Sequence, residues 1–291
     1  MNTVRTFILG NPRSGTSLLR IMLNAHPHIV APPECGFLQW WHEKYQEWDR
    51  KDSKNPNRVK EFVTDVMSSK KIETWDIKGL DIKECIASHR PSSYGELCLC
   101  VYLAQASKSE TNSNTIKSVV DKNNYYINHT EVLNKTWPEA LYIHLIRDGR
   151  DVAASYLDLQ DLESESPYRP DLTYEIEGIA REWSHNNQHI DSFLKSFSPN
   201  RSIRIKYENI IRDPETTLSD VVSFLGLTYS EEMMNYPSHN DEPEATLDWK
   251  QNTLKEPDPS RIGRYKDQIE KSDINTFERM ANESMIQFGY K

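Results

Sequence analysis

The sequence of 291 residues has few cysteines and no excess of positive charge. Its four cysteines are too few for a disulfide-dense scaffold and form no CxxC pair of the kind that binds zinc, so we expect reduced thiols and a cytoplasmic protein. Lysine and arginine total 35 against 44 aspartate and glutamate residues, a net charge of −9, which disfavours a general nucleic-acid binder or a polybasic membrane binder. Any anionic ligand must therefore be held by local groups.

Long apolar runs are also missing. Residues 1–9 lead into Asn11 and Pro12 before a signal-peptide apolar region can form, and no later stretch approaches the ~20 residues that span a bilayer. We therefore expect no transmembrane segment. The chain is 37% hydrophobic, which is enough for a substantial core, and we expect a single domain over residues 1–291.

Short apolar runs predict a sheet of parallel strands. Val4 to Leu9 form a β-branched run that ends at Gly10, and an apolar helix is expected over 17–24. Further strands are expected at 115–120, 140–146 and 202–207, with a helix at 128–137. Strands that alternate with helices are typical of the α/β class, in which helices flank a central, mainly parallel sheet.

The rest of the chain is expected to be mainly helical. Two segments rich in helix formers and aromatic residues, at about 35–114 and 157–198, are interpreted as a helical cap that covers the sheet and shapes a substrate cleft. Long helices are expected at 175–197 and 272–288. The segment 236–260 contains four prolines among polar residues and is interpreted as a long mobile loop.

The segment from Gly10 to Ser17, GNPRSGTS, lies between the first strand and the first helix, where backbone N–H groups and the helix dipole can bind an anion. Its two glycines have the spacing of the NTPase pattern GxxxxGK[ST], but Thr16 occupies the lysine position and Arg13 supplies the positive charge. Hydroxyl groups and an arginine suit an oxyanion that is bound without a metal ion. The alternative interpretation of this loop alone is an ordinary turn.

Two sequence blocks resemble one enzyme family. Pro12 to Arg20, PRSGTSLLR, resembles the 5′-phosphosulfate loop of the sulfotransferases that use 3′-phosphoadenosine 5′-phosphosulfate (PAPS), and its continuation MLNAHP at 22–27 is similar to the tyrosylprotein sulfotransferases and their bacterial relatives. Ile143 to Tyr156, IHLIRDGRDVAASY, is similar to the family's 3′-phosphate signature. The resemblance implies a P-loop-like fold, PAPS as the co-substrate, 3′-phosphoadenosine 5′-phosphate (PAP) as the product, and no metal.

The resemblance also implies which residues bind the nucleotide. Arg147 and Ser155 stand where relatives bind the 3′-phosphate, although the charges around Arg147 could instead be a solvated run. Tyr207 resembles a tyrosine near the nucleotide, with the core as its alternative place. A looser match near the C-terminus adds Arg261 and Arg264. The residues expected at the 5′-phosphosulfate group are Arg13, Ser14, Gly15, Thr16 and Ser17.

Sulfuryl transfer needs a base for the acceptor hydroxyl and positive charge near the oxygen that leaves. Glu34 lies 21 positions after Arg13, where the tyrosylprotein relatives carry their catalytic glutamate, so it is the expected base. Its alternative role is to start a helix after two prolines. Lys122 lies in a segment that resembles the family's Asn-Lys-Asp and is expected to stabilise developing negative charge, together with Arg13.

Histidines and cysteines provide rival assignments. A histidine base is known in many cytosolic relatives, but none of the candidates lies in a matching motif; they are His89, His129, His144, His185 and His189. His144 lies inside an apolar strand and is interpreted as a core residue. Cys98 and Cys100 lie in the apolar run LCLCVYL, where packing explains them and metal binding would need partners that the sequence does not reveal.

The expected acceptor is the hydroxyl of a small alcohol, a glycoside or a lipid-linked metabolite, and a homodimer is allowed for. Four aromatic residues could line its site or belong to the core: Trp40, Trp41, Tyr45 and Trp48. The net negative charge disfavours a polyanionic acceptor, which would need a basic groove. Two other functions stay open, namely a P-loop kinase that uses ATP and magnesium and a non-catalytic nucleotide-binding relative.

Overall fold

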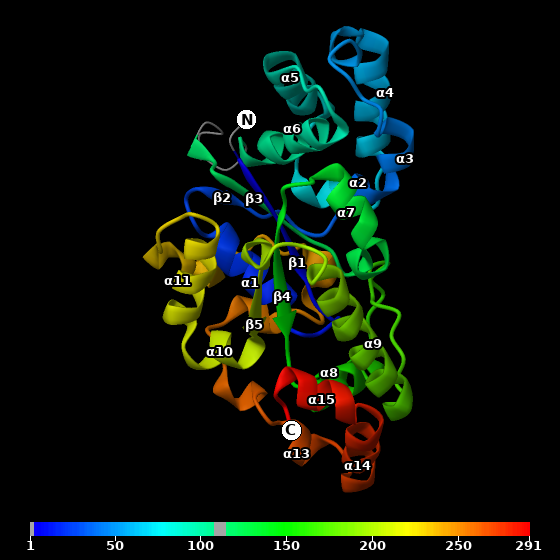
Figure 1. Ribbon diagram of the computed structural model, residues 1–291, viewed down its shortest axis with the longest axis vertical. Coiled ribbons are helices and arrows are strands. Elements are labelled where there is room, and N and C mark those ends of the chain that lie inside the picture. The colour runs from blue at the N-terminus through cyan, green and yellow to red at the C-terminus, as the bar shows by residue number, and fades with distance from the viewer. Residues whose placement is uncertain (1–2, 108–114) are drawn as a thin grey trace.

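A parallel sheet of short apolar strands forms the centre of the molecule (Figure 1). The structure is a computed structural model that describes residues 3–107 and 115–291. Within these residues the sheet has five strands in the order β2-β3-β1-β4-β5, and every neighbouring pair is parallel. The strands are β1 (Val4–Leu9), β2 (Ile29–Val30), β3 (Ser118–Lys122), β4 (Leu141–Ile146) and β5 (Ser202–Lys206). The predicted α/β class with a P-loop-like sheet is confirmed.

Two strand predictions need correction. β2 was not predicted, because two residues are too few to produce a periodic pattern, and it forms by pairing with the first two residues of β3. β3 ends at Lys122 rather than at residue 120, since its pairing with β1 continues to the partner pair Ile8 and Lys122. Lys122 is therefore the last residue of a strand, which fixes its backbone more firmly than a loop would.

Alternate residues of the strands enter different hydrophobic cores. Phe7 and Leu9 of β1 belong to one buried cluster, whereas Ile8 between them belongs to a second cluster with Leu19. Side chains alternate across a strand, so both faces of the sheet are covered and the strands read as continuous apolar runs.

Helices surround the sheet in three groups (Figure 1). The second cluster joins the sheet to α1 (Thr16–Asn24), α10 (Tyr207–Arg212) and α11 (Pro214–Phe224). The end drawn at the top of Figure 1 holds α2 (Phe37–Trp40), α3 (His42–Tyr45), α4 (Pro56–Met67), α5 (Gly79–His89), α6 (Tyr94–Ala106) and, just below, α7 (Thr130–Thr136). The third group is α8 (Gly149–Gln160), α9 (Ile176–Leu194), α13 (Tyr265–Gln268), α14 (Lys271–Met280) and α15 (Asn282–Phe288).

The predicted helices are present with changed limits. The helix expected at 128–137 is α7, and the one expected at 175–197 is α9. The single helix expected at 272–288 is instead two, α14 and α15, which meet at Ala281. Ala281 is buried with Phe277 and Met285 in one cluster, so the change of direction lets both helices bury apolar residues there.

The two segments expected to form a helical cap differ from each other. The segment at 35–114 contains α2 to α6, while its last residues, 108–114, lie outside the described residues. In the segment at 157–198, residues 161–175 form neither a helix nor a strand, and α9 follows. Among the helices that the structure describes, none combines the length and the apolar character needed to cross a membrane.

The segment at 236–260, interpreted above as a long mobile loop, instead folds into short helical turns that pack on α1. It contains α12 (Glu244–Leu247) and several turns of 3-10 helix. The reason is electrostatic. Buried Arg20 of α1 forms ion pairs of 2.8 Å with Asp241 and Glu242, and Glu242 also accepts from Lys250 Nζ at 2.6 Å. Removing one partner of such a buried pair typically costs about 3–5 kcal/mol, so these charges hold the segment in place.

Candidate active site

One cavity of about 730 Å³ opens at the carboxyl ends of the central strands, the edge at which open parallel sheets bind ligands. Its lining contains every predicted site residue except Ser14: Arg13, Gly15, Thr16, Ser17, Glu34, Lys122, Arg147, Ser155, Tyr207, Arg261 and Arg264. Ser14 is buried behind the loop, and its backbone N–H donates to the carbonyl of Asn11 at 3.1 Å. Residues from six separate stretches of sequence thus meet in one place.

The loop between β1 and α1 turns through two residues with left-handed backbone. Arg13 has φ 67° and Gly15 has φ 95°. A Cβ atom on Gly15 would lie 2.4 Å from Cδ2 of the Tyr207 ring, so glycine is required both for the backbone conformation and for this close approach. The first backbone N–H groups of α1 have no partner within the helix and are available to an anion.

Two arginines lie side by side where the loop meets β4. Arg147 donates from Nη1 to the carbonyl of Arg13 at 3.2 Å, and Arg13 donates from Nε to Ser155 Oγ at 3.0 Å. Burial, together with the charge of Arg147, lowers the pKa of Arg13 to about 10. Among the described residues, no carboxylate lies within ion-pair distance of either guanidinium. Two neighbouring cations without a counter-ion form a site for an anion.

The remaining basic residues at this end differ in their availability. The Arg147 guanidinium stacks on Tyr207, 4.4 Å from the ring centroid, and donates from Nη2 to the carbonyl of Arg261 at 2.9 Å. Arg264 pairs with Asp158 at 2.6 Å, whereas Arg261 donates to the Asn252 side chain at 2.6 Å. Tyr207 lines the cavity and also belongs to the second buried cluster, while its contact with a nucleotide stays a prediction.

At the opposite end of the cavity, Glu34 lies among lysines. Lys122 Nζ donates to Glu34 Oε1 and also to Ser17 Oγ at 3.3 Å, and Lys71 Nζ donates to Glu34 Oε2 at 3.1 Å. Burial alone would raise the pKa of Glu34, but the positive charges of Lys122, Lys250 and Lys71 hold it well below its usual range. The carboxylate is therefore ionised at neutral pH and is able to accept a proton or a hydrogen bond.

Lys122 experiences the opposite balance. Its side chain is almost entirely buried, and burial lowers its pKa to about 8 even though the charge of Glu34 favours the protonated form. The position of the ammonium group is set by the end of β3 on one side and by the hydroxyl of Ser17 on α1 on the other. The group is thus placed between the anion-binding loop and the carboxylate.

Some of the histidine and aromatic candidates line the cavity, and others lie in the core. Of the five rival histidines only His129 lines the cavity, and it is exposed. His144 is buried in the core, where it contacts the Asn187 side chain at 3.2 Å and burial lowers its pKa to about 3. Trp40 lines the cavity with 40% of its surface exposed, whereas Tyr45 and Trp48 are core residues.

The sequence did not indicate several residues of the cavity. Lys71, Lys250 and Trp249 carry no motif and arrive from distant segments. Glu182 and Asn186 of α9 also line it, and Asn186 donates to the Asn11 side chain at 2.8 Å, which supports the loop. The sequence did contain one signal for Glu182 and Asn186. They are polar residues four positions apart on the apolar face of a predicted helix, which indicates a role other than packing.

Comparison with known proteins places the chain in one family. The model of the "Sulfotransferase family" matches residues 6–231. A protein described as a protein-tyrosine sulfotransferase of Caenorhabditis briggsae is 27% identical over 79% of this chain and 68% of its own length. Protein-tyrosine sulfotransferase 2 of Gallus gallus is 23% identical over 79% of this chain, which spans 53% of that relative. The solved sulfotransferase domain from the curacin biosynthetic pathway has a similar fold, with a TM-score of 0.61, 21% identity and 97% of each chain covered.

Replacing Gly15 tests whether the loop forms an anion site. The change Gly15→Ala places a methyl group against Tyr207 and is expected to weaken PAP binding at least ~10-fold, because the loop and the face under Arg147 must separate. Isothermal titration calorimetry measures the affinity. Gly226→Ala is the matched control, since Gly226 also has a left-handed φ of 74° but nothing lies within 4 Å of its added Cβ. Equal losses in both variants would contradict this role of the loop.

Proposed function

The chain belongs to the sulfotransferase family, and we propose that it transfers the sulfuryl group of PAPS to an acceptor hydroxyl and releases PAP. The observation that carries the proposal is the pair Arg13 and Arg147, two cations without a carboxylate partner among the described residues, in the same cavity as Glu34 and Lys122. In this reaction the acceptor oxygen forms a bond to sulfur, the bond from sulfur to the bridging phosphate oxygen breaks, and the acceptor proton passes to Glu34.

The nucleotide is proposed to bind along the basic end of the cavity. The loop amides, Arg13, Thr16 and Ser17 would hold the 5′-phosphosulfate group, while Arg147 and Ser155 would hold the 3′-phosphate. The hydrogen bond from Arg13 to Ser155 and that from Arg147 to the Arg13 carbonyl support this arrangement, because they link the two phosphate sites directly. Arg261 and Arg264 would cover the nucleotide from the C-terminal side.

The catalytic step is proposed to use the pair of Glu34 and Lys122. Glu34 is ionised, so it can accept the proton of the acceptor hydroxyl as the oxygen attacks sulfur. Lys122 lies between Glu34 and Ser17, from where it can turn to the bridging oxygen and offset the charge that develops there. When Lys122 turns to the donor, Glu34 loses its nearest cation and becomes a stronger base. Donor binding would thereby activate the base.

The proposed acceptor is a small alcohol, a glycoside or a lipid-linked metabolite. Exposed aromatic side chains at the cavity support this class, because Trp40 and Tyr125 are 40% and 61% exposed and offer flat apolar surfaces. A protein tyrosine is the second candidate, and the similarity to protein-tyrosine sulfotransferases favours it. Lys70 and Lys71 also line the cavity, so the net negative charge of the chain does not by itself exclude an acidic acceptor.

A set of donor measurements tests the reaction class. We expect PAP to bind without magnesium more tightly than ATP does with or without it, and PAPS to be consumed when a suitable phenol, sugar or tyrosine peptide is supplied. Tighter binding of ATP with magnesium, accompanied by phosphoryl transfer, would show a kinase instead. PAP binding with no consumption of PAPS across these three acceptor classes would favour a non-catalytic relative.

The variant Glu34→Gln tests the base. Turnover should fall by ~10²-fold or more while the affinity for PAP stays nearly unchanged, since the amide keeps an oxygen that accepts from Lys122 but cannot take the proton. Single-turnover assays and PAP titration measure the two quantities. Glu139→Gln, an exposed carboxylate outside the cavity lining, serves as the control. Lost PAP affinity with unchanged turnover would remove Glu34 from this role.

The pH profile tests Lys122. Its ammonium must keep its proton to stabilise the leaving oxygen, and its pKa is about 8 in the free protein, so kcat/KM should fall about tenfold per pH unit above that value. Glu34 remains ionised over the same range because its pKa is depressed. In Lys122→Arg the alkaline decline should move up by at least ~2 units, since a guanidinium keeps its charge. Where turnover is too slow to measure, the decline of PAP affinity at alkaline pH reports the same loss of the Lys122 proton. Lys44→Arg, a substitution at the surface, is the control. An unshifted limb in Lys122→Arg would refute the assignment.

A further inference from the structure

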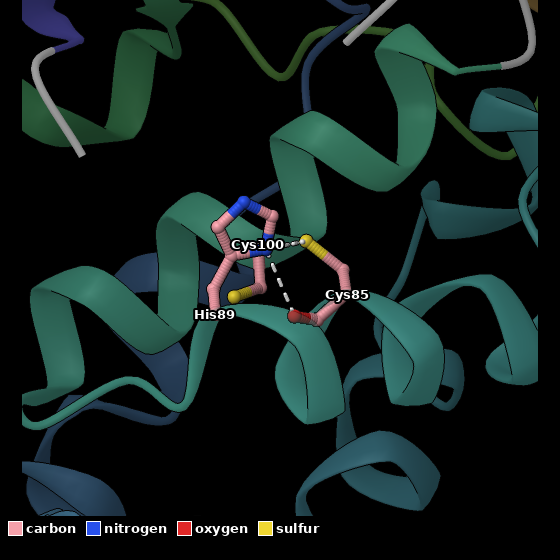
Figure 2. A group of neighbouring side chains, drawn as sticks. All are labelled: Cys85, His89 and Cys100. Atoms are coloured by element: carbon pink, nitrogen blue, oxygen red, sulfur yellow. Dashed lines mark hydrogen bonds between the residues drawn. The ribbon is translucent and has the colours of Figure 1, made fainter. Parts of the chain in front are cut away.

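Three side chains that can ligate a metal ion meet between α5 and α6, outside the cavity (Figure 2). Cys85 and His89 belong to α5, and Cys100 reaches them from α6. Their ligand atoms all lie within 4.8 Å of one another, and Cys85 Sγ is 3.4 Å from His89 Nδ1. The structure therefore supplies the partners for Cys100 that the sequence did not reveal.

The local structure explains why these groups converge. Cys85 and His89 are four positions apart, so they lie on the same face of α5 one turn from each other. Arg90, with φ 49°, ends this helix and Pro91 follows, which turns the chain back into α6. Ile82 and Ile86 bury the inner side of α5 in the main core, and α6 is buried around nearly its whole circumference. The two helices therefore hold the three side chains on a well-packed frame.

We propose that Cys85, His89 and Cys100 bind a zinc ion. Two thiolates and one imidazole are a donor set that Zn²⁺ takes in tetrahedral geometry, and the soft sulfur ligands disfavour Mg²⁺ and Ca²⁺. Bonds of about 2.3 Å to sulfur and about 2.1 Å to nitrogen place tetrahedral ligand atoms roughly 3.5 to 3.8 Å apart. The three groups already approach this spacing, and small side-chain movements complete it.

The protons balance in a simple way. Both thiols lose their protons to solvent when they ligate as thiolates, so each zinc ion releases two protons. The Nδ1–H of His89 donates to the Cys85 carbonyl at 3.0 Å, so this hydrogen bond is lost when Nδ1 ligates the ion and the imidazole proton moves to Nε2. Cys100 is buried and His89 is exposed, so the fourth position of the ion points outward and is filled by water. Zinc would thus join α5 to α6 at the surface of the molecule.

Packing alone does not account for this group. Cys98 lies two residues earlier on α6 and is equally buried, yet it belongs to no such cluster in the described part of the chain. The Cys98 thiol forms a hydrogen bond with the Tyr94 side chain instead. Cys100 differs because it faces both a second thiol and an imidazole.

Cobalt titration of the 291-residue chain tests the site. The protein is reduced, freed of metal with a chelator and titrated with Co²⁺, which reports thiolate ligands by sulfur-to-cobalt charge-transfer absorption and tetrahedral geometry by its visible bands. We expect one Co²⁺ per chain, displaced by Zn²⁺, and a melting temperature that rises on adding Zn²⁺. Cys85→Ser, at a half-buried position, and His89→Ala, at an exposed one, should each weaken metal binding at least ~10-fold. Cys98→Ser is the matched control and should keep the charge-transfer band.

The same experiment can overturn the proposal. Absence of the charge-transfer band in the reduced wild-type chain would exclude a thiolate metal site. A charge-transfer band of equal strength in Cys85→Ser would show that the metal binds elsewhere. A band that is lost in Cys98→Ser but kept in Cys85→Ser would also show that the proposed cluster is not the metal site. Circular dichroism of each variant establishes that it is folded, so that loss of metal is not mistaken for loss of structure. The readout is metal absorption and does not depend on enzyme activity. Cys85, His89 and Cys100 are not part of the cavity lining.

Discussion

The site depends on holding Arg13 and Arg147 together, with no ion-pair partner for either among residues 3–107 and 115–291. Two neighbouring guanidinium groups repel each other, and burial removes the water that would screen them. Arg147 donates to the carbonyls of Arg13 and Arg261 and stacks on Tyr207, and Arg13 donates to the Ser155 hydroxyl. These contacts hold the pair in place without neutralising its charge. In the proposed function, an anion with two phosphate-like ends would supply the negative charge that this pair lacks.

The part of the cavity around Glu34 differs, because there a carboxylate is surrounded by cations. There Glu34 is enclosed by lysines, so the carboxylate stays ionised, and the ammonium of Lys122 is shared between it and Ser17. Both ends carry local positive charge although the chain as a whole has a net charge of −9. The global charge describes the outer surface, whereas the behaviour of a bound anion is decided within a few ångströms, because nearby buried charges are screened little.

A chain of charged side chains connects α1 to Glu34. Arg20 of α1 binds Glu242, and Glu242 accepts from Lys250, whose charge in turn acts on Glu34. This chain keeps the proline-containing segment on α1, so that Trp249 and Asn252 line the cavity and Asn252 orients Arg261. The same helix therefore presents the anion-binding loop at its N-terminus and anchors the opposite wall through its side. Arg20 belongs to the block PRSGTSLLR, and its role is structural support of the site.

The α/β class and the anion-binding loop after β1 could be predicted from the residues alone, because a strand end, a glycine loop and a helix start lie within a few residues of one another and are recognised as one motif. The residues of the second block and the candidates Glu34 and Lys122 came from the family resemblance of short segments. The folded chain was needed to show that β2 exists, that the segment at 236–260 is folded, that the charges of Lys71 and Lys250 act on Glu34, and that Cys85 and His89 lie beside Cys100. These contacts join residues from separate segments, and no periodicity along the chain records which distant side chains the packing of helices will bring together.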